Sequence, residues 1–415
     1  MKNKPRIRFK GFAEDWEQCK LGEIFEYLQN NTLSRDSLNY KNPNIKNIHY
    51  GDILVKFDEI LDGSNKDIPY INSELDLSKF SKSLLQDGDI IFSDTAEDDT
   101  VGKAIELKNV NAPFILSGLH TIPCRPLIPF GKGYLGNFLN SDSYRVQLRP
   151  LVQGIKVSSI SKSALKDTMI EYPKNLDEQE KIGSLFQNVA KMITLHQRKL
   201  EKLKLAKKAL LQKLFPKNGS KFPELRFNGV ADAWEQRELA ELCNVYDGTH
   251  QTPRYTNSGV MFVSVENIKT LESDKYISED DFKNEFKIFP EFGDILLTRI
   301  GDVGSANIIL DNIKRAYYVS LALLKPKGIN SLFLLALLSS ASVQSEIWKR
   351  TLHIAFPKKI NKNEISKVIV SKPSILEQKK IGELIYALDQ IITLHQRKLD
   401  KLQEVKKGLL QKMFV

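Results

Sequence analysis

Residues Glu178–Phe215 read EQEKIGSLFQNVAKMITLHQRKLEKLKLAKKALLQKLF, and residues Glu377–Phe414 read EQKKIGELIYALDQIITLHQRKLDKLQEVKKGLLQKMF. The two stretches align without a gap at an offset of 199 residues, and about 23 of the 38 aligned positions are identical. A repeat of this length and period indicates the duplication of a whole half-protein and argues against a solenoid of small units. We therefore expect a pseudo-twofold internal repeat.

Both copies have the composition and apolar spacing of a long helix. Neither contains proline, and apolar side chains recur at intervals of three and four residues, which is typical of a coiled-coil seam. The predicted seam and subunit-docking positions are Ile193, His196, Leu200, Leu203, Ile392, His395, Leu399 and Leu402. Each helix would be roughly 58 Å long at ~1.5 Å per residue, and an antiparallel pair of the two copies is the simplest way to bury both seams. For the two seam histidines we favour packing over chemistry, and we expect Lys207 and Lys406 to extend out of the seam to solvent.

Composition narrows the class of protein. The chain has 415 residues, of which 41% are hydrophobic, enough for two or three domains with apolar cores. A formal net charge of +10 favours a polyanionic partner, nucleic acid before membrane. Cys19, Cys124 and Cys243 form no CxxC motif, so neither a disulfide framework nor a cysteine zinc site is expected. The first residues contain no apolar signal core, and the most apolar run, Leu332–Leu338, is too short to span a bilayer, so we expect a cytoplasmic protein.

A shorter repeat precedes each half. Pro5–Glu23 reads PRIRFKGFAEDWEQCKLGE and returns as PELRFNGVADAWEQRELAE at Pro223–Glu241. The order is therefore arm, variable block and helix, twice, with a Pro- and Gly-containing break between the halves. The expected segments are a first arm (1–20), a first variable domain (21–175), a first helix (176–216), a linker with the second arm (217–238), a second variable domain (239–374) and a second helix (375–415).

The two variable blocks share a frame but differ between its elements. Both mix short β-like runs with turn residues, both contain a GDI(I/L) strand, and both end in a similar phrase, ISKSALKDTMIEYP or INKNEISKVIVSKP. The fold class is thus α/β of the α+β type, with two mixed domains separated by a long antiparallel coiled-coil pair. A shared frame with different exposed loops is what two domains that recognise two different ligand sequences would need.

One loop stands out as a candidate binding site. Asp247–Tyr255 reads DGTHQTPRY, in which Thr249, His250, Thr252, Arg254 and Tyr255 offer donors, acceptors and a ring suited to base edges and phosphates. An ordinary polar turn is the alternative interpretation. The other candidate DNA contacts, each of which could equally be plain surface, are Lys156, Ser158, Ser159, Arg299, His353, Lys358 and Lys359.

The sequence offers no catalytic or metal-binding motif. It has no Walker A sequence, HExxH, GxSxG or methyltransferase tetrapeptide, and no His and Cys at metal-ligand spacing. Gly131, Gly133 and Gly136 spell GxGxxG, but a poor preceding strand favours a turn over a dinucleotide site. The basic residues of the helices leave three interpretations open: a DNA face, a protein-docking face or a solvated face.

The chain resembles the specificity subunits of type I restriction–modification systems, the HsdS family, over essentially its full length. The resemblance rests on the paired RF-x-G…WEQ arms, the GDI(I/L) strands, the ISK…P ending, the EQxKIG helix starts, and ITLHQRKL followed by LLQK(L/M)F. The DGTHQTPRY loop also resembles one found in the target-recognition domains of this family.

The resemblance implies a non-enzymatic DNA-recognition subunit. Each variable domain would be a target-recognition domain that reads one half of a bipartite site in double-stranded DNA. The helices would set the spacer and dock two methyltransferase (modification) subunits, to which motor-nuclease (restriction) subunits are added. S-adenosylmethionine, ATP and Mg would be used by those partners, with no cofactor in this chain. A coiled-coil scaffold or adaptor without sequence-specific DNA binding is the alternative.

Overall fold

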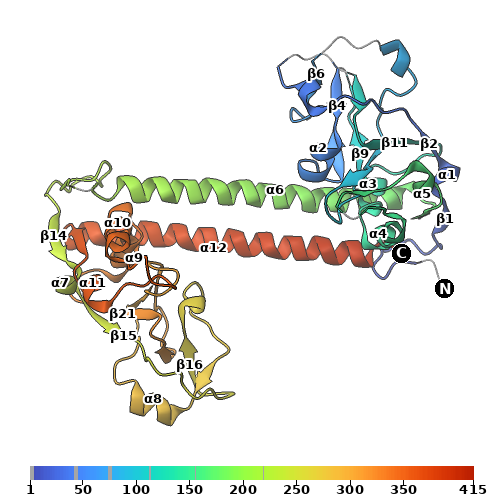
Figure 1. The fold of residues 1–415 in the computed structure, drawn as a ribbon. Helices are drawn as coiled ribbons and strands as arrows, with labels where there is room; N and C mark the ends of the chain where they lie inside the picture. The colour runs from blue at the N-terminus through green and yellow to red at the C-terminus, as the bar shows by residue number, and fades with distance from the viewer. Residues whose placement is uncertain (1–3, 42–44, 73–76, 112–113, 155, 218) are drawn as a thin grey trace. The chain divides into compact units, whose positions relative to one another are not determined.

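The computed structural model describes residues 4–41, 45–72, 77–111, 114–154, 156–217 and 219–415, so residues 1–3 of the expected first arm lie outside the described residues. The chain divides into two compact units, which we describe separately. Unit 1 comprises Met1–Gln197 and Lys398–Val415, and unit 2 comprises Arg198–Arg397. Two long helices, α6 (Leu176–Lys213) and α12 (Ile375–Lys412), therefore each contribute a segment to both units (Figure 1).

The two long helices pair side by side in each unit. In unit 1 the beginning of α6 lies beside the end of α12, and the rings of Phe186 and Phe414 stack with their centroids 5.6 Å apart. In unit 2 the end of α6 lies beside the first half of α12, where Lys207 Nζ and Asp389 Oδ1 are 2.5 Å apart. The pair is antiparallel, which confirms the predicted helix pair.

The seam positions named from the sequence are all at least partly buried. Those that are buried are Leu200, His395 and Leu399, and those that are half-buried are Ile193, His196, Leu203, Ile392 and Leu402. The expectation that Lys207 and Lys406 extend to solvent is wrong, because both form ion pairs. Lys207 pairs with Asp389, and Lys406 Nζ lies 2.8 and 2.9 Å from the two carboxylate oxygens of Glu59.

Unit 1 is built from small mixed sheets covered by short helices. Its five-stranded sheet has the order β2 (Phe25–Tyr27), β11 (Thr121–Pro126), β7 (Ile90–Ser93), β9 (Ala104–Lys108), β5 (Ile60–Asp62). Its four-stranded sheet has the order β10 (Ile115–Ser117), β4 (Lys46–Ile48), β6 (Tyr70–Ile71), β3 (Leu38–Asn39). The antiparallel pairs are β1 (Glu17–Lys20) with β13 (Met169–Tyr172), and β8 (Thr95–Ala96) with β12 (Ser158–Ser159). The helices are α1 (Leu21–Ile24), α2 (Tyr50–Val55), α3 (Tyr134–Phe138), α4 (Asp142–Leu148), α5 (Lys162–Lys166), and the 3-10 turns η1 (Arg35–Ser37), η2 (Leu77–Phe80), η3 (Arg149–Leu151).

Unit 2 repeats this plan with fewer strands among the described residues. Its four-stranded sheet has the order β15 (Cys243–Asp247), β21 (Leu321–Pro326), β18 (Ile295–Thr298), β19 (Ala306–Ile308). Its other strands are β17 (Tyr276–Ile277), β16 (Val260–Val263) and β20 (Arg315–Tyr317) in one sheet, and the pair β14 (Glu235–Glu238) with β22 (Ile369–Lys372). The helices are α7 (Leu239–Leu242), α8 (Glu279–Glu285), α9 (Ser331–Leu338), α10 (Ala341–Arg350), α11 (Lys362–Ser366) and the 3-10 turn η4 (Val265–Asn267). The mixed fold class predicted from the sequence is confirmed in both units.

Within the described ranges no single helix is long and apolar enough to cross a membrane. Only α9 and α10 taken together, which are bent by 65° at the break between them, pass a test of length and composition. Most of α9 is buried in the core of unit 2, where its apolar residues are already covered.

The GDI motif forms the entry to the central strand of each larger sheet. Gly88 and Gly293 take positive φ angles of +85° and +89°, which a residue without a Cβ adopts at little cost. The aspartates that follow them pair with a basic residue of the neighbouring strand, Asp89 with Arg125 and Asp294 with Lys325. The apolar residues that come next form β7 and β18, which are buried along their whole length.

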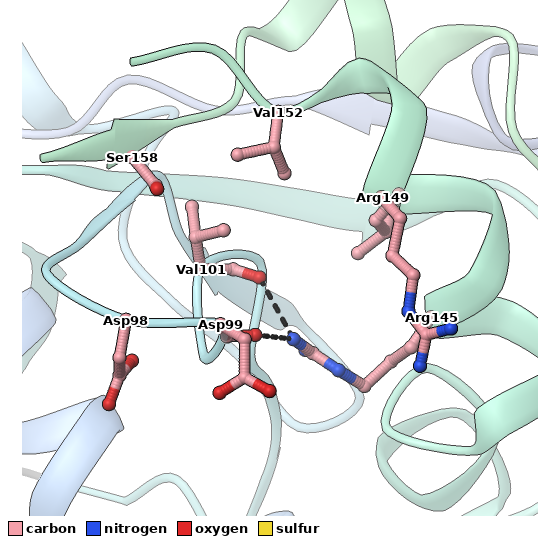
Figure 2. Close-up of a pocket in the computed structure, with 8 residues that line it drawn as sticks. Asp98, Asp99, Val101, Arg145, Arg149, Val152 and Ser158 are labelled. Carbon is pink, nitrogen blue, oxygen red and sulfur yellow. Dashed lines mark hydrogen bonds between the residues drawn. The ribbon is translucent and has the colours of Figure 1, made fainter. Parts of the chain in front are cut away.

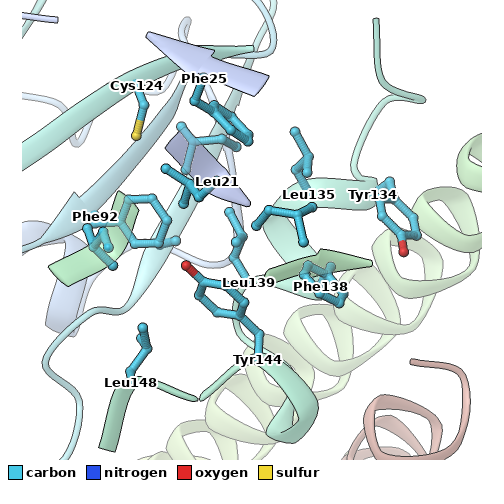
Figure 3. Close-up of a cluster of buried hydrophobic side chains, with 14 of the residues drawn as sticks. Leu21, Phe25, Phe92, Cys124, Tyr134, Leu135, Phe138, Leu139, Tyr144 and Leu148 are labelled. Atoms are coloured by element: carbon cyan, nitrogen blue, oxygen red, sulfur yellow. The ribbon is translucent and has the colours of Figure 1, made fainter. Parts of the chain in front are cut away.

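The phenylalanine that ends each helix repeat completes the core of one unit. Phe414, after α12, belongs to the core of unit 1, with its ring centroid 5.8 Å from that of Tyr134 and 5.7 Å from that of Phe138. Figure 3 labels Tyr134 and Phe138 among the buried side chains of this core. Phe215, after α6, packs in the same way in unit 2, 5.9 Å from Trp234. The repeated LLQK(L/M)F ending is therefore a packing signal.

The glutamate of each EQxKIG motif binds the arginine of one arm. Arg8 donates from Nε and Nη2 to the two carboxylate oxygens of Glu178, at 2.6 and 2.8 Å. Arg226 makes the same two contacts with Glu377, at 3.0 and 2.6 Å. Both carboxylates are almost fully buried and both guanidinium groups are partly buried, so each arm is held to its helix by a bidentate pair.

The glutamine of the same motif joins two backbone segments to the helix start. Gln179 accepts the N–H of Gly131 at 2.7 Å, and Gln378 accepts the N–H of Asn330 at 3.0 Å. Each side-chain amide also donates to the carbonyl of the proline that precedes the helix, at 2.7 and 2.9 Å. These bonds satisfy buried polar groups. Together with the arginine–glutamate pairs, they explain why Glu and Gln recur at the start of both long helices.

The GxGxxG run begins in the turn that the sequence favoured and continues into the first residues of α3. Gly133 and Gly136 donate their N–H groups to the two carboxylate oxygens of Glu106, at 2.6 and 2.8 Å. Burial raises the pKa of Glu106 to about 7, and the two N–H groups oppose that rise. The glycines thus serve contacts within unit 1.

Two helix glycines allow the domain backbone to approach the long helices. A Cβ added at Gly183 would lie 2.2 Å from the carbonyl oxygen of Lys132, and one at Gly382 would lie 2.5 Å from the backbone nitrogen of Phe333. Glycine to alanine inside a helix normally stabilises by ~0.5–1 kcal/mol. Here the clash is with backbone, so Gly183→Ala and Gly382→Ala are each expected to lower the free energy of unfolding by about 1–3 kcal/mol.

Gly408 supplies the matched control on α12. A Cβ there meets nothing within 4 Å, so Gly408→Ala is expected to stabilise by roughly 0.5–1 kcal/mol. Urea denaturation of the three variants measures the expected loss of stability at Gly183 and Gly382 and the expected gain at Gly408. Stabilisation by all three substitutions would show that the helices do not need these close approaches.

Candidate nucleic-acid interface

Arg299 joins the two candidate binding segments of unit 2. It follows β18 and is buried, and its guanidinium pairs through Nη1 with Asp247, which ends β15. Its Nε donates to the carbonyl of Ile360 at 3.1 Å, and its backbone N–H donates to Ser320 at 2.9 Å. Arg299 therefore holds the start of the DGTHQTPRY loop and the segment after His353–Lys359 against one strand end. Its Nε and Nη1 groups serve this joint, and a DNA contact by Arg299 stays a prediction.

The DGTHQTPRY loop leaves the sheet edge and is exposed beyond its first residues. Gly248 is required there, because an added Cβ would lie 2.4 Å from the backbone of Tyr318. Thr249 is half-buried and exchanges backbone hydrogen bonds with the segment that follows β20. The residues that are exposed are His250, Thr252, Arg254 and Tyr255. Their role as DNA contacts stays a prediction.

Tyr255 is exposed but anchored. Its ring lies edge-on to Phe262, with centroids 5.7 Å apart, and Lys275 Nζ lies 5.9 Å from the ring centroid. An aromatic ring that is held on one side and open on the other is suited to stacking with a base. The loop therefore offers a fixed ring beside the exposed Arg254.

The segment Leu352–Lys359 is a hairpin held by the same strand end. Leu352 donates its N–H to the carbonyl of Lys359 at 2.8 Å, and Gly301 donates its N–H to the carbonyl of Lys358 at 2.8 Å. The ring of His353 lies on that of Trp348, with centroids 4.6 Å apart. The candidates His353, Lys358 and Lys359 are all exposed. The structure thus brings the loop and the hairpin candidates together around Arg299.

Unit 1 has the equivalent hairpin with different residues. Ser158 and Ser159 form β12, which pairs with Thr95–Ala96, and the exposed Lys156 precedes them. Beside the hairpin lies a pocket of about 310 Å³, lined by Asp98, Asp99, Val101, Arg145, Leu148, Arg149, Val152 and Ser158 (Figure 2). Arg145 donates to the carbonyls of Asp99 and Val101 at 2.5 and 3.2 Å, whereas Arg149 is exposed.

Sequence reasoning missed a histidine at the corresponding edge of unit 1. His120 is exposed and has a positive φ of 55°, which is uncommon outside glycine and clusters at functional sites. Its Nδ1 lies 3.2 Å from Asp94 Oδ1 and 3.3 Å from Thr95 Oγ1, and its ring meets Tyr50 edge-on at 5.3 Å. These groups offer donors and acceptors to a base edge as the loop of unit 2 does.

The two edges share one backbone frame. Asp94 donates its N–H to the carbonyl of His120 at 3.1 Å, as Arg299 does to Ser320, and Ile160 donates to Asp94 as Ile360 does to Arg299. Asp94 therefore occupies the place of Arg299, with the opposite charge. The shared closing phrase, ISK against INK, is the signal from which this correspondence could have been found.

Of the described residues, no three His, Cys, Asp or Glu side chains come together as a possible metal site. The polar groups at the two edges are donors, acceptors and rings, with cations beside them. Such an arrangement can recognise a ligand by hydrogen bonding and stacking.

Comparison with known proteins gives consistent results. The family model described as the type I restriction modification DNA specificity domain matches residues 13–205 and 231–404. The type I restriction enzyme MjaX specificity subunit of Methanocaldococcus jannaschii is 23% identical over 414 residues, covering 96% of this chain and 92% of its own. The MjaVIII specificity subunit of the same organism is 22% identical over 284 residues, or 63% and 65% of the two chains. The crystal structure of the type I restriction–modification S subunit from M. genitalium has the same fold, with a TM-score of 0.66, 15% identity and 99% of both chains covered.

Proposed function

The chain belongs to the family of type I restriction–modification DNA specificity subunits, and on that premise we propose that each unit reads one half of a bipartite site in double-stranded DNA. The observation that carries the proposal is the repeated frame with unlike residues at its edge. Arg299 and Ser320 in unit 2 stand where Asp94 and His120 stand in unit 1. One backbone frame that carries two different sets of side chains is suited to the recognition of two different base sequences. The family match covers both units, and a scaffold without DNA recognition is not supported.

We further propose that the long helices set the spacer between the half-sites and dock two modification subunits. Each unit exposes apolar side chains on its helix segments, Met192 and Leu195 in unit 1 and Ile391 and Leu394 in unit 2. These four residues occupy equivalent places in the two repeats, because 391 and 394 follow 192 and 195 by the offset of 199. A repeated exposed apolar patch supports two equal protein contacts. Restriction subunits would then join that complex.

We propose that this chain itself catalyses no reaction. S-adenosylmethionine, ATP and Mg would act in the modification and restriction subunits. The lack of any catalytic motif in the sequence supports this division of work.

Exchange of one variable domain tests the reading function. Replacing residues 239–374 by the equivalent block of a relative is expected to change the bases of one half-site and to leave the other half-site and the spacer as they were. Mapping of methylated positions in DNA modified by the assembled complex measures this. The matched exchange of residues 21–175 is expected to change the other half alone. A change in both halves, or in neither, from a single exchange would contradict the proposal.

A further inference from the structure

The hairpin Leu352–Lys359 exposes apolar side chains at its tip. Ile354 and Phe356 are fully exposed, at 99% and 105% of their reference areas, and Trp348 beside the hairpin is 65% exposed. Burying one such side chain is worth roughly 1.5–3 kcal/mol, so the tip is suited to a partner that takes these groups out of water.

The charges around the tip favour a polyanion as that partner. Residues Thr351–Ile360 read TLHIAFPKKI, which includes the exposed Lys358 and Lys359 and no acid. The nearest acidic side chains of the flanking helices, Glu346 and Glu364, already pair with basic residues of those helices. An apolar tip on a basic stem is complementary to stacked bases between two rows of phosphates.

The hairpin also continues the candidate DNA-binding edge. Arg299 binds the carbonyl of Ile360 at the end of the hairpin and the carboxylate of Asp247 at the start of the DGTHQTPRY loop. Because Arg299 connects the loop to the hairpin, a DNA duplex that contacts the loop also lies next to the hairpin. A protein partner would have to avoid or share this edge.

We propose that Ile354 and Phe356 form a wedge that inserts into a base-pair step of the DNA bound by unit 2. The inference rests on the proposed function and adds a mode of recognition to it. Apolar wedges unstack a base step and kink the duplex, at a cost that depends on how readily that step deforms. The wedge thereby contributes preference for a flexible step without a hydrogen bond to any base.

Trp348 and His353 pack together beside the hairpin tip, with their rings tilted by 43°. Their ring centroids are 4.6 Å apart, and a ring nitrogen of His353 lies 2.8 Å from the carbonyl oxygen of Trp348. These contacts hold His353, the residue before Ile354, to α10.

Unit 1 has a different residue at the place of Trp348. Arg149 stands eight residues after the helix cap Ser141, as Trp348 stands eight after Ser340, so a cation replaces the ring. The hairpin of unit 1 turns tightly at Gly154, where φ is +108° and an added Cβ would lie 2.0 Å from the carbonyl of Val157. In the described part of that hairpin Val157 is 51% exposed, less than Ile354 and Phe356, so the wedge is proposed for unit 2.

The test uses the chain assembled with its modification subunits and a duplex that carries the methylation-mapped site. 2-Aminopurine is placed at each step of both half-sites, apart from the methylated positions. The unsubstituted complex is expected to raise the fluorescence at one step of the half-site of unit 2. The double variant Ile354→Ala/Phe356→Ala is expected to remove that signal and to weaken binding about tenfold, with an unchanged salt dependence.

Two matched variants complete the design. Val157→Ala, in the hairpin of unit 1, is expected to leave the signal in place. Lys358→Ala is expected to keep the signal and to lower the slope of log K against log salt by about 1, if Lys358 neutralises one phosphate as the wedge model requires. Because Ile354 and Phe356 are fully exposed, their removal leaves the fold intact.

Three results would overturn the wedge. They are the absence of an unstacked step in the half-site of unit 2, a signal that persists in the double variant, and a double variant that loses its modification subunits and binds its bipartite site with unchanged affinity. Each leaves the proposed function standing as long as the complex still prefers its bipartite site. Loss of that preference in the unsubstituted complex would refute the proposed function instead.

Discussion

Phe414→Ala is expected to lower the free energy of unfolding of unit 1 by about 3–5 kcal/mol, the usual cost of deleting a fully buried aromatic ring. Phe414 is 3% exposed and packs on the rings of Tyr134, Phe138 and Phe186. Its loss leaves a cavity between the end of α12 and the core, and the helix backbone cannot close that cavity without leaving its other contacts. Guanidinium unfolding followed through Trp16, whose ring lies 6.0 Å from that of Tyr134, measures the change.

Phe215→Ala is the matched variant in unit 2. Its ring lies 5.9 Å from that of Trp234 and 5.8 Å from that of Phe333, so a similar loss is expected, reported through Trp234. Leu205→Ala removes an apolar side chain of α6 that is 69% exposed, and a change within about 0.5 kcal/mol is expected. Losses below about 1 kcal/mol for both phenylalanines would mean that the helix ends do not complete the two cores.

Glu178→Ala is expected to cost about 3–5 kcal/mol, because it strands a charge that the fold keeps largely out of water. The Glu178 side chain is 1% exposed and that of Arg8 is 13% exposed. The hydrogen bond to Glu178, which raises the pKa of the Arg8 guanidinium, is absent from the variant, but an arginine is charged at ordinary pH even without it, so Arg8 loses its carboxylate partner and keeps its charge. Urea unfolding measures the loss, and limited proteolysis of residues 4–20 reports release of the arm.

Glu377→Ala repeats the experiment in unit 2, where Arg226 makes the same bidentate contact. Glu180→Ala, two residues after Glu178 on the exposed face of α6, is the control, for which little change is expected. The double variant Arg8→Met/Glu178→Leu is expected to recover most of the stability, because apolar replacement of a whole buried pair is often neutral. A double variant as unstable as Glu178→Ala would mean that the carboxylate acts through contacts other than Arg8.

Local sequence patterns predicted much of the architecture. The seam spacing of Leu200 and Leu399 identified both long helices and their burial, and the gapless repeat predicted an antiparallel pair. The GDI motif predicted the central strands, because a glycine that can adopt positive φ followed by apolar residues is a local signal. For the candidate interface the sequence named the exposed loop and hairpin residues, whose role as contacts stays a prediction.

The pairing of charged groups could not be predicted from local sequence patterns. Arg299 after a strand has the composition of a DNA contact, but in the fold Asp247, 52 residues earlier, takes its guanidinium. His120 was missed because an isolated histidine has no pattern, and only its positive φ and its approach to Asp94 distinguish it. Lys406 was expected in solvent because its partner, Glu59, is 347 residues away along the chain.

The sequence by itself determined the duplication, the two long helices and the family, because periodicity and repeated motifs are found by comparing the letters of the chain, without knowing which residues meet in space. Only the tertiary structure decided that each unit is completed by the end of the other half's helix, with Phe414 in unit 1 and Phe215 in unit 2. Tertiary structure alone also decided which of the two candidate cations, Arg299 or Arg254, stays exposed to a ligand. The physical reason is that burial and ion pairing depend on which segments meet in space, and residues of identical local character differ once a partner far along the chain covers one of them.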